Sequence, residues 1–216
     1  IYGEIETRSS DTAIIARSMD FPDSLSVSSW AAYTNSPIFL TDFSEQGLTQ
    51  GTLDALARGG FTRVLVLGSE LSVPASVVEQ AISASGLSAS DVVRLGGIDR
   101  VDTSVKIAEW ATDPARGAEA LSYDNVAVTR ADSHTDALAG GALQGMHGSV
   151  ILLTWTDRTH PGVLSVIGSA EDGINEIRFF GDEKSVAVST MQAYVKAIQF
   201  EDHAWKPDNS VAFDLG

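Results

Sequence analysis

The sequence predicts an α/β protein whose mainly parallel sheets are covered by helices. Short apolar runs alternate with segments of helical periodicity along almost the whole of its 216 residues. The apolar runs are continuous, as in strands that are buried on both faces of a parallel sheet. Strands that alternate with helices in this way are typical of parallel βαβ units. The sequence also matches itself when it is shifted by 113 residues, which predicts two tandem modules.

The expected strands are runs rich in Val, Ile, Leu and Phe. In chain order they cover residues 13–16, 36–40, 63–68, 92–96, 125–129, 149–154 and 176–181. The expected helices lie around and between them, at 24–34, 50–58, 74–85, 101–112, 135–146, 161–169 and 185–199. In the fourth helix, Val101, Val105 and Ala108 form the apolar stripe, and we expect Asp102 or Thr103 to cap its first turn.

The internal repeat is ungapped from residue 17 to residue 83. Arg17 aligns with Arg130, Asp23 with Asp136, and "SPIFLT" at 36–41 with "SVILLT" at 149–154. Two unrelated α/β stretches would drift out of register over such a length, so a duplication explains the match best. Asp23 and Asp136 each follow a strand at the turn into a helix. A carboxylate there can cap the helix or line a site at the carboxyl end of the sheet.

The segment "VVRLGGIDRVDTSVKIAEW" at 92–110 occurs only once, between the two matching halves. We therefore predict a first module at 1–91 that lacks its own copy of this strand and helix, a second module at 92–200, and a C-terminal tail at 201–216. We also expect a further copy of the segment to precede Ile1 in a longer array.

Four side chains crowd the turn of this segment: Arg94, Asp99, Arg100 and Thr103. A dinucleotide-binding loop needs the spacing G-x-G-x-x-G, whereas this turn has a single glycine pair and aspartates that would repel a phosphate. We therefore interpret the four residues as a structural joint between modules. Paired arginine and aspartate side chains would hold such a joint when they are partly buried.

The composition excludes several classes of protein. A net charge of −15 repels nucleic acid and anionic lipid, and no apolar run is long enough to span a membrane. The chain has no cysteine, its four histidines lack the spacing of a zinc site, and it has no EF-hand motif, so we expect neither a metal nor a cofactor. No hydrolase motif such as G-x-S-x-G or H-E-x-x-H is present, so we expect no enzyme within this chain.

The order of the motifs resembles the cell-wall-binding repeat 2 family of Gram-positive bacteria. "RLGGIDRVDTS" leads a helix and is followed by "SHTDALAGGAL", "SVILLT" and "GDEKSV", while the first half carries "DFPDSLSVSSWA", "SPIFLT" and "GSELSVPAS" in the same order. The resemblance covers roughly residues 13–199. It implies Toprim-like or Rossmann-like modules without catalytic activity. Such modules anchor surface proteins or wall hydrolases non-covalently to an anionic glycopolymer of the cell wall, outside the cell.

The resemblance ties polymer binding to an Ile-Leu-Leu run that follows a proline. In this sequence the run corresponds to Pro37, Ile38, Phe39 and Leu40 in the first module, and to Ile151, Leu152 and Leu153 in the second. Phe39 replaces a leucine of the family pattern, and Val150 replaces the proline. The residues themselves favour a simpler interpretation, in which both runs are buried central strands that hold the following loops in place.

Polar and aromatic side chains follow both runs, namely Thr41 and Asp42 in the first module and Thr154, Trp155 and Arg158 in the second. An aromatic ring can pack on the apolar face of a sugar while polar groups bind its hydroxyls, and Arg158 could pair with a phosphate or carboxylate. We therefore predict a polymer contact surface at these strand ends. The competing interpretation is that Trp155 packs between modules.

The net charge opposes binding to an anionic polymer. We expect either local contacts through Arg130 and Arg158 or a bridging divalent cation. One alternative is a structural module that associates with a neighbouring module or as a homo-oligomer and has no polymer site. Another is a Toprim-like or flavodoxin-like enzyme, for which Asp132, Asp136 and Glu183 would be a loose acidic cluster.

Overall fold

The computed structural model describes residues 11–198 except 45, 136 and 137. Its first sheet consists of β1 (Thr12–Ala16), β2 (Ile38–Leu40), β3 (Arg63–Leu67) and β4 (Val92–Leu95), in the order β2-β1-β3-β4. Its second sheet consists of β5 (Ser122–Arg130), β6 (Ser149–Thr154) and β7 (Glu176–Phe180), in the order β6-β5-β7. All pairings are parallel, which confirms the α/β class with parallel sheets.

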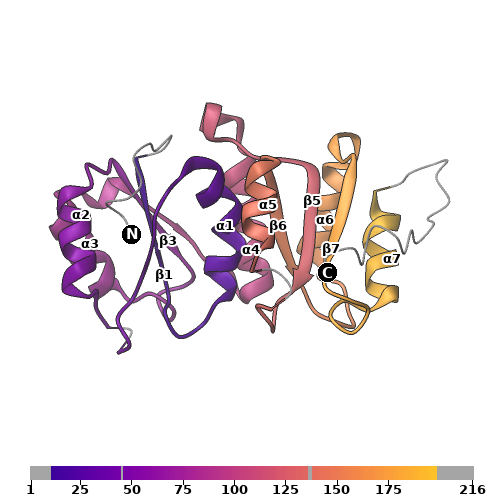
Figure 1. Cartoon of the computed structure of the whole chain (residues 1–216), viewed down its shortest axis with the longest axis horizontal. Coiled ribbons are helices and arrows are strands. Elements are labelled where there is room, and N and C mark those ends of the chain that lie inside the picture. The colour runs from indigo at the N-terminus through magenta and orange to yellow at the C-terminus, as the bar shows by residue number, and fades with distance from the viewer. Residues whose placement is uncertain (1–10, 45, 136–137, 199–216) are drawn as a thin grey trace.

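Helices fill the space between the sheets and cover the outer ends of the molecule (Figure 1). Helices α1 (Pro22–Thr34) and α4 (Arg100–Thr112) pack against β6 of the second sheet and against each other. Helices α2 (Gln50–Arg58) and α3 (Ala75–Ser85) pack together beside the first sheet. The second sheet also carries α5 (Gly140–Met146), α6 (Pro161–Ser169) and α7 (Val188–Ala197). Short 3-10 turns occupy Ala89–Asp91, Pro114–Glu119 and Glu171–Gly173.

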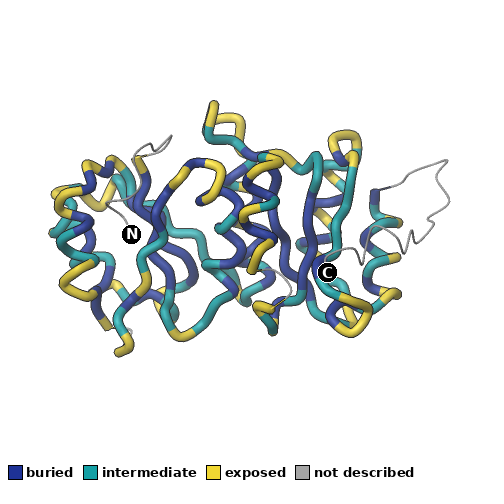
Figure 2. The backbone as a smooth tube through the Cα atoms, in the orientation of Figure 1, coloured by how far each residue is buried: buried dark blue, intermediate teal, exposed yellow. Residues whose placement is uncertain are grey.

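Two apolar cores follow from this arrangement. The smaller core lies between the first sheet and helices α2 and α3 and includes Ile15, Leu56 and Val66. The larger core runs from the other face of the first sheet, through α1 and α4, into the second sheet. Figure 2 shows the resulting band of buried backbone in the middle of the molecule. The two sheets therefore share one core.

The unique segment at 92–110 connects the two sheets. Its strand, β4, pairs in parallel with β3 and completes the first sheet. Its helix, α4, packs against β6 of the second sheet. The boundary predicted at residue 92 thus falls between β3 and β4, two strands that pair in one sheet.

Two details of the predicted elements need correction. Helix α5 begins at Gly140 rather than at residue 135, five residues later than expected. Helix α4 is capped by Asp99, whose carboxylate accepts a hydrogen bond from the backbone N–H of Asp102, so the cap is neither Asp102 nor Thr103. The hydroxyl of Thr103 instead accepts a hydrogen bond from the N–H of Gly97. Asp102 accepts one from the N–H of Ile98.

Candidate functional site

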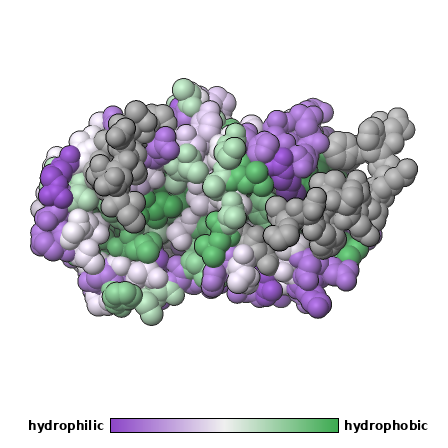
Figure 3. Space-filling view, viewed as in Figure 1, coloured by the Kyte–Doolittle hydropathy of each residue, from purple (hydrophilic) through white to green (hydrophobic). Residues whose placement is uncertain are grey.

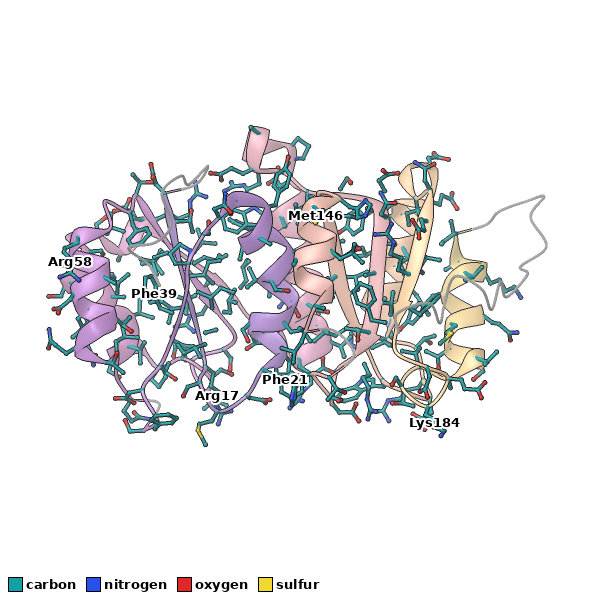
Figure 4. The ribbon with its side chains drawn as sticks, viewed as in Figure 1. Arg17, Phe21, Phe39, Arg58, Met146 and Lys184 are labelled. Atoms are coloured by element: carbon teal, nitrogen blue, oxygen red, sulfur yellow. The ribbon has the colours of Figure 1, made fainter. Side chains whose placement is uncertain are left out.

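A cavity of about 290 Å³ lies where the loops at the carboxyl ends of β1, β3, β4 and β6 meet. In Figure 4, Arg17 and Phe21 mark this edge of the molecule, and Met146 lies away from it. The β1–α1 loop and the start of α1 contribute Arg17, Asp20, Pro22 and Asp23; the other loops and the start of α4 contribute Ser69, Ser72, Gly97, Ile98, Asp99, Arg100, Thr103 and Trp155. Carboxyl ends of parallel strands are the usual place for a ligand in α/β proteins.

Two glycines bring the loops around the cavity close together. A Cβ on Gly96 would lie 2.6 Å from the carbonyl carbon of Gly68, so the loops after β3 and β4 can approach only without a side chain there. Gly68 itself has a φ of 88°, in the left-handed region that favours glycine. A Cβ at that position would lie 2.6 Å from a carboxylate oxygen of Asp23. Gly68 and Gly96 therefore shape one wall of the cavity.

Arg100 links the cavity to both sheets. Its guanidinium donates one hydrogen bond to the carboxylate of Asp20, at 3.0 Å, and another to the backbone carbonyl of Ala131, at 3.0 Å. Asp20 belongs to the loop after β1, and Ala131 directly follows β5. Arg100 thus ties the first sheet's loop to the end of the second sheet.

The other residues of the predicted joint have separate roles. Arg94 donates hydrogen bonds to the carbonyls of Gly68 and Val73 and so holds the loop after β3. Asp99 caps α4, and its second carboxylate oxygen lies 3.8 Å from Nε2 of His160 at the start of α6. Arg94, Asp99 and Arg100 therefore do not form one shared network of charges. Arg94 binds carbonyl groups of the loop after β3, whereas Arg100 binds Asp20 and the carbonyl of Ala131.

Asp23 lines the cavity and is half-buried, as Asp20 and Asp99 are. Its burial raises its pKa to about 6, the negative charge of Asp20 adds to this effect, and Arg100 and Arg17 oppose it. Among the described residues, no hydrogen bond to the Asp23 side chain is found, and α1 begins without a side-chain cap. Asp23 is the second residue of α1, after the N-cap position at Phe21, and therefore does not serve as the N-cap. Its repeat partner, Asp136, lies outside the described residues.

The two Ile-Leu-Leu runs lie in strands at the ends of their sheets, not in central strands as expected. Pro37 precedes β2, and its carbonyl accepts a hydrogen bond from Ile14. Ile38 and Phe39 in β2 are half-buried, and Leu40 is 46% exposed. In β6, Ile151, Leu152 and Leu153 are fully buried. The difference arises because α1 and α4 cover β6, whereas β2 forms the outer edge of the first sheet.

The polar residues after these strands hold their loops. The Thr41 hydroxyl accepts a hydrogen bond from the N–H of Ser18, and the Ser18 hydroxyl donates to the carbonyl of Asp42. A hydrogen bond from Ser44 lowers the pKa of Asp42. Neither Thr41 nor Asp42 lines the cavity, which they support through the β1–α1 loop.

In the second sheet, the buried Thr154 hydroxyl lies 2.6 Å from the Tyr194 hydroxyl and 3.4 Å from the carbonyl of Arg158. This network holds the loop that carries Trp155 into the cavity lining. The guanidinium carbon of Arg158 lies 5.0 Å from the centre of the Trp155 ring, within range of a cation–π contact. Of the predicted strand-end residues, Trp155 alone lines the cavity, with Arg158 against it.

The cavity could be found only in part from the sequence. Asp23, Asp99, Arg100, Thr103 and Trp155 were singled out for separate reasons, and the fold brings them to one cavity. Arg17 was marked by its alignment with Arg130, but Asp20, Ser69 and Ser72 carried no signal of their own. In the part of the chain that the structure describes, no cluster of acidic or histidine side chains could hold a metal ion, and no helix is long and apolar enough to cross a bilayer.

The fold and the site define an α/β module with a small polar cavity at the strand ends. The sequence matches the family model of cell wall binding domain 2 (CWB2) over residues 4–78 and 94–191, and the chain belongs to this family. It is thus a cell-wall-binding module. A comparison with curated protein sequences gives no match.

Solved structures show the same fold. The structure of Cwp6 from Clostridium difficile superposes with a TM-score of 0.75 at 22% sequence identity, covering 88% of this chain and 28% of that chain. Cwp8 from Clostridium difficile superposes with a TM-score of 0.72 at 19% identity, covering 88% of this chain and 30% of that chain. The chain therefore spans less than a third of the length of either protein.

Proposed function

We propose that this chain anchors a larger surface protein non-covalently to an anionic glycopolymer in the wall of a Gram-positive bacterium. Membership of the cell wall binding family carries the proposal. The two structural neighbours come from a Gram-positive species, and both are much longer than this chain, as expected of proteins to which such a module is attached. The proposal places the module outside the cell and assigns no catalysis to it.

The cavity at the strand ends supports this function and suggests where contact occurs. It combines an indole ring, hydroxyl groups and charged side chains, a set of groups that suits a sugar. Thr41, Asp42 and the Ile-Leu-Leu runs would then act behind this surface, since they hold the loops and the sheet edges in place.

Sedimentation with isolated walls tests the proposal. The purified chain should pellet with walls of the source bacterium and should remain in solution with walls from which the anionic polymers have been removed. Equal pelleting with both kinds of wall, or with neither, would contradict the proposed target.

Because the chain has a net charge of −15, the effects of salt and of a chelator on binding distinguish two modes of attachment to an anionic polymer. If Arg17, Arg130 and Arg158 contact anionic groups of the polymer directly, added salt should weaken binding progressively. If a divalent cation bridges the acidic protein and the polymer, a chelator should release the protein at low salt. A salt titration with and without chelator separates these two modes of attachment.

A second role, association with a further module or a second copy, is favoured by the edge of the second sheet. Within the described residues β7 has no strand on its outer side, whereas its counterpart β3 is paired with β4. An unpaired parallel edge can accept a strand from another chain. Light scattering would test this role. A concentration-dependent increase in mass would support it, and a monomer at all concentrations would exclude self-association.

A further inference from the structure

Asp23 is the one carboxylate of the cavity that no described residue binds. Asp20 accepts hydrogen bonds from the N–H of Phe21 and from Arg100, and Asp99 caps α4. Asp23, by contrast, accepts no hydrogen bond from the described residues, although it is half-buried. A desolvated carboxylate without donors is costly, so its retention in a cavity suggests that a ligand supplies the donors.

The charges of the cavity favour a ligand with hydroxyl groups over a phosphate. Three carboxylates and two guanidinium groups line it, and the Arg100 guanidinium is already bound to Asp20 and to the carbonyl of Ala131. A phosphate beside Asp20 and Asp23 would meet two like charges in a partly desolvated space. A sugar, by contrast, offers hydroxyl donors to Asp23 and an apolar ring face to Trp155.

The size of the cavity and the side chains that line it both fit a single sugar ring. A volume of about 290 Å³ lies at the lower end of small-ligand sites and suits a single sugar ring rather than a length of polymer. The hydroxyl groups of Ser69 and Ser72 line the wall near Asp23, and both can donate or accept hydrogen bonds. On the face viewed in Figure 3, hydrophobic residues gather over the middle of the molecule, and hydrophilic residues predominate towards its two ends.

We propose that the cavity binds one sugar unit of the wall polymer, with sugar hydroxyls donating to Asp23 and the ring packed against Trp155. The anionic groups of the polymer stay outside the cavity. This inference rests on the proposed function and adds which part of the polymer is recognised.

Two variants test the inference in the wall-binding assay. Asp23→Asn keeps the shape of the side chain but removes the charge that accepts the hydroxyls, and Trp155→Ala removes the ring. A carboxylate accepts hydrogen bonds about twice as strongly as a neutral amide oxygen does, so Asp23→Asn should weaken binding by up to about tenfold. Asp172→Asn, at an exposed residue after α6, makes the same change of charge outside the cavity and should bind as the unmodified chain does. Asp23→Asn binding as tightly as the unmodified chain would overturn the inference.

Chemical treatment of the walls provides an independent readout. Periodate cleaves neighbouring hydroxyl pairs of sugars and leaves phosphodiester and carboxylate groups in place. Walls oxidised with periodate and then reduced with borohydride should bind the unmodified chain poorly. Undiminished binding to oxidised walls would overturn the inference while leaving the proposed function intact. Failure of the unmodified chain to bind untreated walls would instead overturn the proposed function.

Discussion

At the scale of single residues, the cavity is built from groups whose neighbours restrict them. Asp20 and Arg100 hold each other, Asp99 caps a helix, and Gly68 and Gly96 allow two loops to touch. Asp23 differs, because burial and the charge of Asp20 disfavour its ionised form. Functional sites often contain such a group, whose environment lowers the stability of the fold.

The raised pKa of Asp23 makes a prediction about stability and pH. The pKa of Asp23 in the folded protein, about 6, lies above the ordinary value of 3.8, so the ionised side chain destabilises the fold. This penalty is absent below pH 3.8, grows as the pH rises to 6, and is complete above pH 6. Asp23→Asn removes the penalty and should raise the free energy of unfolding at pH 7.5 by on the order of 1–2 kcal/mol. Denaturant titrations should show no such gain near pH 3.8. A loss of stability at pH 7.5 would show that Asp23 is bound by a group within the protein.

Gly96 is expected to tolerate no side chain. The methyl group of Gly96→Ala would lie 2.6 Å from the carbonyl carbon of Gly68, and backbone cannot move aside as a flexible side chain can. We expect a loss of about 1–3 kcal/mol in the free energy of unfolding, because overpacking has this cost. Gly173→Ala, where no atom lies within 4 Å of the added methyl, is the matched control. Thermal unfolding of the two variants checks the difference.

At the scale of the elements, the two Ile-Leu-Leu runs differ in burial although their sequences match. Strand β6 is covered by α1 and α4, whereas β2 is partly open. This contrast separates a packing role from direct polymer contact, because the exposed Leu40 could touch a polymer and the buried Leu152 could not.

Leu152→Ala should therefore cost about 2–5 kcal/mol of folding stability. Leu40→Ala, with the side chain 46% exposed, should cost less than about 1 kcal/mol. If Leu40→Ala nevertheless weakens wall binding while Leu152→Ala, assayed below its unfolding temperature, does not, β2 contacts the polymer directly. Comparable losses of stability in the two variants would contradict the burial difference.

The elements were largely predictable, whereas the sheet order and the cavity were not. Continuous apolar runs such as 63–68 and 149–154 mark strands because burial on both faces demands them. The same signal cannot distinguish a central strand from an edge strand covered by helices, so β6 was expected at the centre. The N-cap of α4 was misplaced by three or four residues, since Asp99, Asp102 and Thr103 are all good caps and the turn geometry decides among them. The cavity depends on four loops that are distant in the sequence.

At the scale of the whole molecule, the two sheets share a single apolar core. Buried residues of the first sheet, such as Ile14 and Leu65, belong to the same cluster as Val128 and Leu152 of the second. Helices α1 and α4 are the elements that join them. The sheets should therefore unfold together in one transition, despite the duplication in the sequence.

Calorimetry checks this expectation, because the calorimetric and van't Hoff enthalpies should agree. Arg100→Ala removes the hydrogen bonds to Asp20 and Ala131 that link the two sheets' loops. It should lower the unfolding temperature without splitting the transition, since the apolar core stays intact. Two separate unfolding transitions in the unmodified chain would show that the two sheets unfold independently.

With the module boundary predicted at residue 92, the sequence repeat and the folded unit are out of phase. One sequence repeat begins with a strand that completes the preceding sheet and continues with a helix that covers the following one. Each repeat in a longer array would therefore contribute a strand to the sheet of the repeat before it. If recombination removed one repeat, the next repeat would supply an equivalent strand to the same sheet edge. We therefore expect that such an array can gain or lose units without creating an unpaired sheet edge at the point of exchange.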